Sequence, residues 1–192
     1  MTTVEIKKDL RQILSEKRYE HTLGVEYTAA CLAMRYGADM EKAKLAGLLH
    51  DCAKQLSTED KLAYCEQYGL SVSEYEARNP ELLHAKLGAL FAKIRYGVDD
   101  PEILSAITWH TTGKPEMTLL DKILYIADFI EPNRDQAKNL PQVRKMAFDD
   151  IDDCLYRILE DSIVYLNGRN ITVDPMTQIT YESYKAIRKN QK

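Results

Sequence analysis

Long apolar runs, basic charge and chain-breaking residues are all scarce in this sequence of 192 residues, and each scarcity excludes a class of protein. No apolar run is long enough to span a bilayer, and the first residues, Met1–Glu5, lack the basic and apolar segments of a secretory signal. The net charge is −4, so nucleic acid is not expected as a partner. The eight glycines and six prolines form no linker and no low-complexity tract. We therefore expect a single domain over residues 1–192, without a membrane or nucleic-acid partner.

Cysteine is rare too, and its spacing gives no sign of a disulfide framework. None of the four cysteines forms a C-x-x-C pair, and a chain of this length does not need disulfides to be stable. We expect reduced, mostly buried thiols and a cytoplasmic protein. The four residues are Cys31, Cys52, Cys65 and Cys154.

Patterns typical of β-strands are absent, whereas helical patterns fill most of the chain. Apolar residues recur at helical spacing, and Ser, Thr, Asp, Pro and Gly residues mark the ends of these segments. We predict an all-α domain of about eight to ten helices of ordinary length. The predicted helices are Val4–Leu14, Arg18–Tyr36, Met40–Ala53, one that begins at Ser57, Glu81–Tyr96, Glu102–Trp109, Leu119–Ile130, a short one from Pro141, Asp149–Leu166 and Thr177–Lys189.

All four histidines fall inside or at the end of a predicted helix. His50, His84 and His110 share a helix face with small or apolar residues, so their imidazoles are expected to point toward the core. A single buried histidine is usually a neutral residue bonded to a neighbour, but several together are harder to bury. Imidazole is the commonest metal ligand, and a bound metal offsets the burial of several rings.

Two aspartates strengthen the case for a metal. Asp128 lies within Ile123–Ile130, a segment that is apolar on nearly every side, and an uncompensated buried carboxylate costs several kcal/mol. It needs a cation, which a metal ion or a paired Arg or Lys side chain could supply. Asp51 follows His50 directly and either joins the same metal site or is an ordinary residue at a helix end.

Several stretches of the sequence carry a resemblance to a known family. They are His21, Ala46–Lys54 (AGLLHDCAK), Leu83–His84, His110–Gly113 (HTTG) and Ile126–Arg134 (IADFIEPNR). Together they resemble the HD-domain metal-dependent phosphohydrolases, and within them the YqeK-type bacterial subfamily, from about Arg18 to Arg134. The resemblance implies a helical HD bundle with a metal-binding core over about residues 18–134 and C-terminal helices, residues 141–192, packed on it.

The resemblance also implies a dinuclear metal site in the core of the bundle. Iron is the metal expected from the family, although nitrogen and oxygen ligands suit Mn, Co and Zn as well. The implied ligands are His21, His50, Asp51, His84, His110 and Asp128.

Members of the subfamily are symmetrical dinucleoside tetraphosphate hydrolases, which cut diadenosine tetraphosphate into two ADP. The resemblance therefore implies attack of a metal-bound hydroxide on an inner phosphorus, with Asp51 as the bridging carboxylate. Lys54 comes four residues after His50, so we expect it on the same helix face, where it would contact a phosphate or the leaving oxygen. The alternative is a solvated lysine beyond the end of a helix.

Other residues are candidates for binding the substrate. Arg134 offers a planar guanidinium for a phosphate, and the groups that follow His110 can donate hydrogen bonds to phosphate oxygens. In the subfamily, the stretch equivalent to residues 167–176 helps to bind the nucleotide. Each candidate has an alternative. Arg134 could be a surface arginine, the residues after His110 could form a plain turn, and residues 167–176 could be a connecting loop. The expected substrate-binding residues are Arg18, His110, Thr111, Arg134, Ile171, Thr172, Val173, Asp174, Pro175 and Met176.

Three other functions remain open from the sequence. The chain could be another HD-type nucleotide phosphohydrolase, such as a nucleotidase or a guanosine tetraphosphate hydrolase. It could be a non-catalytic module that senses a metal or a nucleotide, or a purely structural helical protein. A ferritin-like site is disfavoured because the Glu-x-x-His pattern at Glu81–His84 occurs once. We expect a dinucleoside polyphosphate or nucleoside diphosphate as ligand, and tyrosine-rich segments leave a homodimer open.

Overall fold

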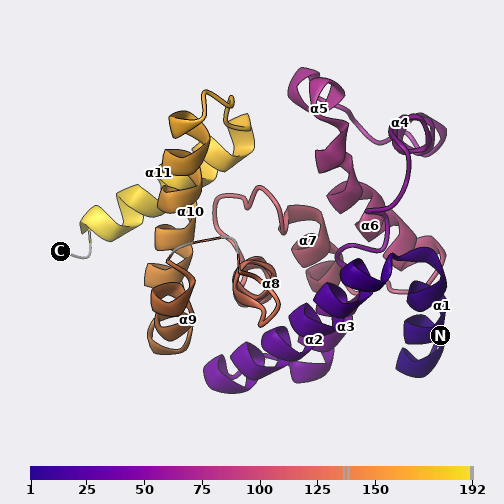
Figure 1. Cartoon of the computed structure of the whole chain (residues 1–192), viewed down its shortest axis with the longest axis horizontal. Coiled ribbons are helices and arrows are strands. Elements are labelled where there is room, and N and C mark those ends of the chain that lie inside the picture. Colours follow the sequence, from indigo (N-terminus) through magenta and orange to yellow (C-terminus); the bar gives the residue numbers. More distant parts are fainter. Residues whose placement is uncertain (136, 138, 191–192) are drawn as a thin grey trace.

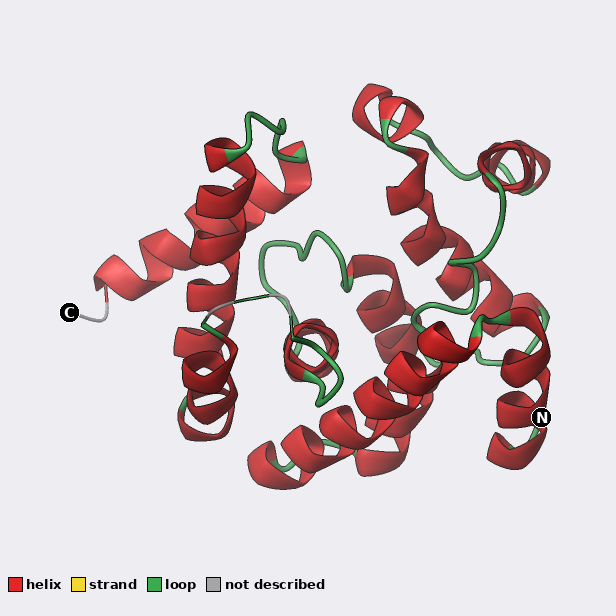
Figure 2. Ribbon diagram, in the orientation of Figure 1, coloured by secondary structure: helices red, strands yellow, loops and turns green. Residues whose placement is uncertain are grey.

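Helices account for the regular structure of the computed structural model, which describes residues 1–135, 137 and 139–190 (Figure 1). These residues form eleven α-helices and one 3-10 helix, without a β-strand (Figure 2), so the predicted all-α class is confirmed. The elements are α1 (Thr3–Ile13), α2 (Glu16–Tyr36), α3 (Met40–Leu49), α4 (Thr58–Gln67), α5 (Glu74–Arg78), η1 (Pro80–Leu82), α6 (Leu83–Ile94), α7 (Pro101–Trp109), α8 (Leu119–Ile130), α9 (Leu140–Asp149), α10 (Ile151–Gly168) and α11 (Pro175–Asn190).

The helix ends follow the capping residues of the sequence. Ser57 begins α4 by accepting a hydrogen bond from the backbone N–H of Asp60, and Thr118 forms a capping box with Asp121 at the start of α8. Gly37 ends α2 in the left-handed conformation, with φ of 72°. The described part of the chain has one α-helix more than the eight to ten predicted. The additional helix is the five-residue α5, which is too short to show a helical period and which the sequence signals only by a cap at Ser71–Glu74.

The segment after α3 differs from its prediction. The helix predicted over Met40–Ala53 ends at Leu49, and residues 50–55 form tight turns instead. In these turns the N–H of Cys52 bonds the carbonyl of Leu49 at 3.1 Å, and the N–H of Lys54 bonds that of Asp51 at 2.9 Å. Where the chain leaves α3, its backbone hydrogen bonds thus change from the α-helical spacing of four residues to the tighter spacing of three.

Helix α8 lies in the middle of the molecule, between two groups of helices. It packs against α2, α3 and α7 on one side and against α10 on the other, and it is seen end-on in Figure 1. Its residues from Ile123 to Ala127 are all buried, as expected of a helix that is covered on most sides. Any polar side chain at the end of this segment must therefore find its partners inside the protein.

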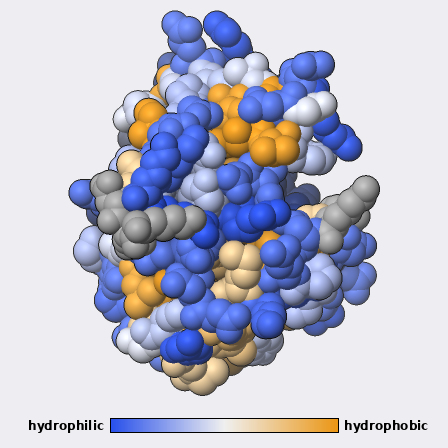
Figure 3. All heavy atoms as spheres, turned by 90° about the vertical axis from the view of Figure 1, so that its left-hand side faces the viewer, coloured by the Kyte–Doolittle hydropathy of each residue, from blue (hydrophilic) through white to orange (hydrophobic). Residues whose placement is uncertain are grey.

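The face formed by α9, α10 and α11 is mostly hydrophilic, and its hydrophobic residues lie in separate patches (Figure 3). No helix among the described residues has the length and apolar character needed to cross a bilayer. The division into a core and packed C-terminal helices stays a prediction, and residues 191–192 of that stretch lie outside the described residues.

Candidate metal centre

Six polar side chains from five helices and one turn meet beside α8. Helix α2 supplies His21, α6 supplies His84 and α8 supplies Asp128. His50 and His110 stand at the C-terminal ends of α3 and α7, where the chain leaves the helix. The six residues, called the histidine–aspartate cluster below, are His21, His50, Asp51, His84, His110 and Asp128.

Asp51 lies at the centre of the histidine–aspartate cluster and divides it into two halves. Its Oδ2 atom lies 3.5 Å from Nε2 of His50 and 3.9 Å from Nε2 of His21. Its Oδ1 atom lies 3.1 Å from Nε2 of His84 and 3.7 Å from Nε2 of His110. Each carboxylate oxygen therefore faces a different pair of imidazoles, an arrangement suited to a carboxylate that bridges two cations.

The far nitrogen of each imidazole fixes which nitrogen faces the cluster. In His50, Nδ1 lies 2.7 Å from the carbonyl oxygen of Gly47, three residues earlier, and in His110 it lies 2.7 Å from that of Ile107. His84 repeats this contact with the carbonyl of Glu81. A carbonyl oxygen only accepts, so Nδ1 carries the proton in each ring. The lone pair of Nε2 is then left pointing into the cluster.

These lone pairs lack partners of the right kind. The buried Nε2 atoms of His21 and His50 make no hydrogen bond. The Nε2 atoms of His84 and His110 lie 3.2 Å apart, which brings two lone pairs face to face. Buried acceptors are normally satisfied, and facing lone pairs repel unless a cation lies near both. The donor set therefore fits metal ions of the kind bound by imidazole and carboxylate.

The two carboxylates of the cluster are held in their ionised form. Burial alone would raise the pKa of Asp51, but His50, His110 and His84 outweigh it and hold that pKa well below its usual range. Burial likewise opposes the ionisation of Asp128, whereas His21, whose Nε2 lies 3.0 Å from Oδ1, and the charge of Arg134 lower its pKa. The cluster is thus a fixed site of negative charge.

Three cationic side chains, called the cationic rim below, border the cluster. Arg18 donates to Oδ2 of Asp51 at 2.7 Å, and Arg134 donates to Oδ1 of Asp128 at 2.6 Å. Asp128 is therefore paired with an arginine, one of the two alternatives left open by the sequence. A bound metal is indicated by the unpaired imidazole nitrogens and not by Asp128. Lys54 completes the rim, and burial lowers the pKa of its ammonium group.

Lys54 reaches the cluster by a route that the sequence does not predict. Its Nζ lies 3.3 and 3.4 Å from the two ring nitrogens of His84. The expectation that it shares a helix face with His50 is wrong, because residues 50–55 are turns and not α-helix. The turn still points the side chain at the cluster.

Most of the other predicted contact residues line two cavities. Thr111 and Arg134 line a cavity that reaches His110 and Asp128 of the cluster. Asp174, Pro175 and Met176 line a second cavity, together with Thr111. The residues Ile171, Thr172 and Val173 line neither cavity, and Ile171 is 47% exposed.

Comparison with known proteins places this arrangement in a family. A model of the HD domain matches residues 18–133, which include all six residues of the cluster. The chain belongs to the HD domain family. Its relatives include proteins named symmetrical bis(5'-nucleosyl)-tetraphosphatase. The one from Bacillus subtilis is 41% identical over 90% of this chain and 91% of its own length. The one from Staphylococcus aureus is 35% identical over 90% and 89%.

A crystal structure supports the same membership. It is that of a predicted HD superfamily hydrolase involved in NAD metabolism from Clostridium acetobutylicum, which is 39% identical to this chain. The TM-score is 0.94, and the match covers 97% of this HD domain protein and 98% of the other chain. The likeness therefore extends beyond residues 18–133 to helices α9, α10 and α11.

One residue that supports the cluster of this HD domain is missed by sequence reasoning. Oε1 of Glu131 lies 3.0 Å from Nδ1 of His21, and Oε2 accepts from the N–H of Asn133 at 2.7 Å. Glu131 is 1% exposed, and a Cβ atom at Gly24 would lie 2.2 Å from its Oε2. The feature of the sequence that could have revealed Glu131 is its place directly after the apolar segment of α8, three positions after Asp128.

Proposed function

We propose that this HD domain protein hydrolyses dinucleoside tetraphosphates symmetrically, turning diadenosine tetraphosphate and water into two ADP. The single observation that carries the proposal is the pair of imidazole sets that face opposite oxygens of Asp51. The names of the relatives from Bacillus subtilis and Staphylococcus aureus, which match about 90% of the chain, favour this substrate over other phosphate esters.

The proposal includes two metal ions in the histidine–aspartate cluster, with iron expected and Mn, Co or Zn compatible. His21 and His50 would bind with Oδ2 of Asp51, and His84 and His110 with Oδ1, while Asp128 adds a further oxygen. Metal ions bound there would supply positive charge that polarises phosphoryl oxygens and lowers the pKa of water.

The cationic rim has its own part in the proposed mechanism, because it meets the charge of the tetraphosphate. The whole chain carries a net charge of −4, so a polyanion needs local cations at the site. Arg134 presents a planar guanidinium that can exchange Asp128 for a phosphate, and Arg18 stands in the same relation to Asp51. Lys54, beside His84, would contact the phosphate or the leaving oxygen.

One nucleoside would bind in the cavity beside the start of α11. This cavity has a volume of about 380 Å³, within the range of about 300–1,000 Å³ that is usual for small-molecule sites. Trp109 and Tyr75 supply aromatic surface, and Met176 supplies an adaptable apolar contact. Thr111 lines both this cavity and the cavity that reaches the cluster, so its hydroxyl is a candidate donor to a phosphate.

The proposal is tested by a nucleotide panel with metal-reconstituted protein. Symmetrical hydrolysis gives ADP as the sole product of diadenosine tetraphosphate, whereas asymmetrical hydrolysis gives ATP and AMP. Preferred hydrolysis of a mononucleotide or of guanosine tetraphosphate would instead support the alternative HD-type phosphohydrolases. Nucleotide or metal binding without turnover would support a sensing module. A cytoplasmic location and a homodimer stay predictions of the sequence.

A further inference from the structure

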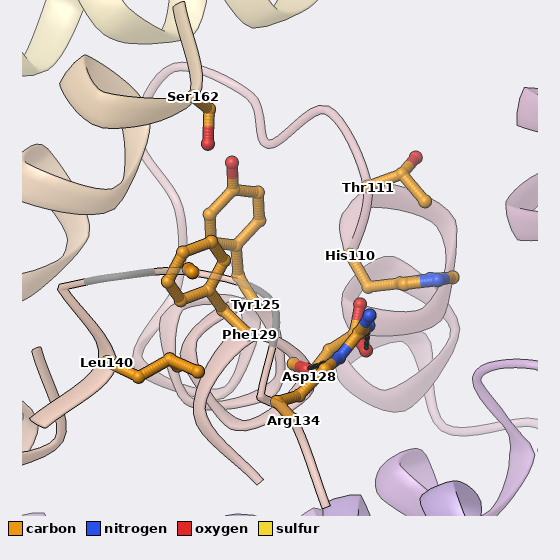
Figure 4. Close-up of a pocket in the computed structure, with 9 residues that line it drawn as sticks. His110, Thr111, Tyr125, Asp128, Phe129, Arg134, Leu140 and Ser162 are labelled. Carbon is orange, nitrogen blue, oxygen red and sulfur yellow. Dashed lines mark hydrogen bonds and ion pairs between the residues drawn. The ribbon is translucent and has the colours of Figure 1, made fainter. Parts of the chain in front are cut away.

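The cavity that adjoins the cluster extends well beyond the phosphate-binding groups. It has a volume of about 300 Å³ and begins at His110 and Asp128. Figure 4 shows Tyr125, Phe129 and Leu140 on the side opposite His110, with Ser162 above them. The lining therefore changes from charged groups at the cluster to ring faces and aliphatic carbon between α8, α9 and α10.

Two hydroxyl groups stand at the far end of this cavity. The hydroxyls of Tyr125 and Ser162 point toward one another in Figure 4. No hydrogen bond joins either hydroxyl to another of the described residues, and both residues line the cavity. A hydroxyl that faces a cavity can donate to and accept from a ligand, so the two are suited to a ligand with polar groups on an otherwise apolar ring.

The two cavities lie on either side of Thr111, which lines both of them. Arg134 lines the cavity between α8, α9 and α10 and bonds Asp128 of the cluster. A symmetric dinucleoside carries the same nucleoside at each end, and cleavage at its midpoint leaves two equal halves. The cavity between α8, α9 and α10 reaches the cluster at His110 and Asp128, and the other cavity shares Thr111 with it, so a substrate centred on the cluster can direct one nucleoside diphosphate toward each.

We propose that the cavity between α8, α9 and α10 is a second nucleoside site, which binds the other half of the dinucleoside tetraphosphate. The inference rests on the proposed function and adds a specificity determinant to it. The purine stacks on the ring faces of Tyr125 and Phe129, and its polar edge meets the hydroxyls of Tyr125 and Ser162. Arg134 binds the adjoining phosphate.

The test narrows this cavity and leaves the cluster unchanged. Ser162→Phe places a ring in the cavity, and Val164→Phe adds the same ring two residues later on α10, at a position that is 66% exposed. Ser162→Phe should raise KM for diadenosine tetraphosphate by about tenfold or more, because pocket contacts discriminate by such factors. Val164→Phe should stay within about twofold of the wild type.

Binding of the product provides a second readout. Titration of the metal-loaded protein with ADP should give about two ADP per chain in the wild type and in the Val164→Phe variant, and about one in the Ser162→Phe variant. Tyr125→Phe removes only one hydroxyl. It tests the same cavity without the added ring of Ser162→Phe, which could disturb packing. It should raise KM about fivefold, the usual effect of one lost hydrogen bond.

The outcomes separate this inference from the proposed function. Equal KM values for Ser162→Phe and Val164→Phe, or one ADP per wild-type chain, would overturn the second nucleoside site while hydrolysis persists. Failure of the wild-type protein to release ADP from diadenosine tetraphosphate would overturn the proposed function itself.

Discussion

The histidine–aspartate cluster and the cationic rim differ in how firmly their side chains are held. In the cluster, each imidazole is fixed by its helix and by the contact of Nδ1, and five of the six residues are buried. In the rim, the side chains of Arg18 and Arg134 are 29% and 41% exposed. We infer that the cluster decides whether the reaction occurs, whereas the rim decides how tightly the substrate binds.

The largest effect is expected from a change inside the cluster. His50→Ala removes one unpaired Nε2 and should lower kcat/KM for diadenosine tetraphosphate by about a thousandfold or more, since metal-based stabilisation is worth several kcal/mol. Release of ADP measures the loss, and circular dichroism checks that helicity is retained. Glu66→Ala, at an exposed position on α4, is the control. Turnover retained in His50→Ala would remove the distinction between cluster and rim.

The cluster was also the part of the site that the sequence revealed most fully. Histidines on apolar helix faces are unusual, so His50, His84 and His110 stand out without any structure. The resemblance added His21 and favoured the metal site over a plain helix end for Asp51, and all of these side chains do meet. An exposed loop offers no such signal, because polar and small residues are ordinary there. Ile171 and its two successors illustrate this, since they line neither cavity.

The fold was predictable wherever a helix end depends on local chemistry. The caps at Ser57 and Thr118 follow from short-range hydrogen bonds. The end of α3 at Leu49 does not, because no glycine or proline marks it and the turn is tied to the packing of His50 and Asp51. The contact of Glu131 with His21 joins residues 110 positions apart, which no local pattern reports.

A smaller effect is expected from the buried support of the cluster. Glu131→Ala leaves Nδ1 of His21 without its acceptor and should weaken metal binding by about tenfold to a hundredfold, the usual loss for a partner of a metal-bound histidine. Competition with a chelator measures the metal affinity directly. Glu131→Gln keeps one acceptor oxygen and should recover part of the affinity, which a purely steric role of this side chain would not explain.

A change in the rim should alter binding more than turnover. Arg134→Lys keeps the charge but loses the planar pair of donors, so KM should rise about tenfold while kcat changes little. Steady-state kinetics separate the two constants, and Arg78→Lys, on the exposed face of α5, is the matched control. A fall in kcat as large as that of His50→Ala would place Arg134 with the cluster and not with the rim.

The smallest effect is expected at Met176, which lines a cavity that none of the cluster residues lines. Its side chain lines the cavity that we assign to the first nucleoside, and methionine contacts with aromatic rings are worth about 0.3–1.5 kcal/mol. Met176→Ala should therefore raise KM about twofold to tenfold, without a change in metal content. Met34→Ala, the same substitution at a position on α2 that is 64% exposed, should leave KM unchanged. If the cluster and the rim differ in this way, the effects must fall in this order, because the binding energy of one half-buried apolar contact is small beside that of a fixed, buried charge. If Met176→Ala lowered kcat as much as it raised KM, positioning of the nucleoside would govern the chemical step, and the separation between the two regions would fail.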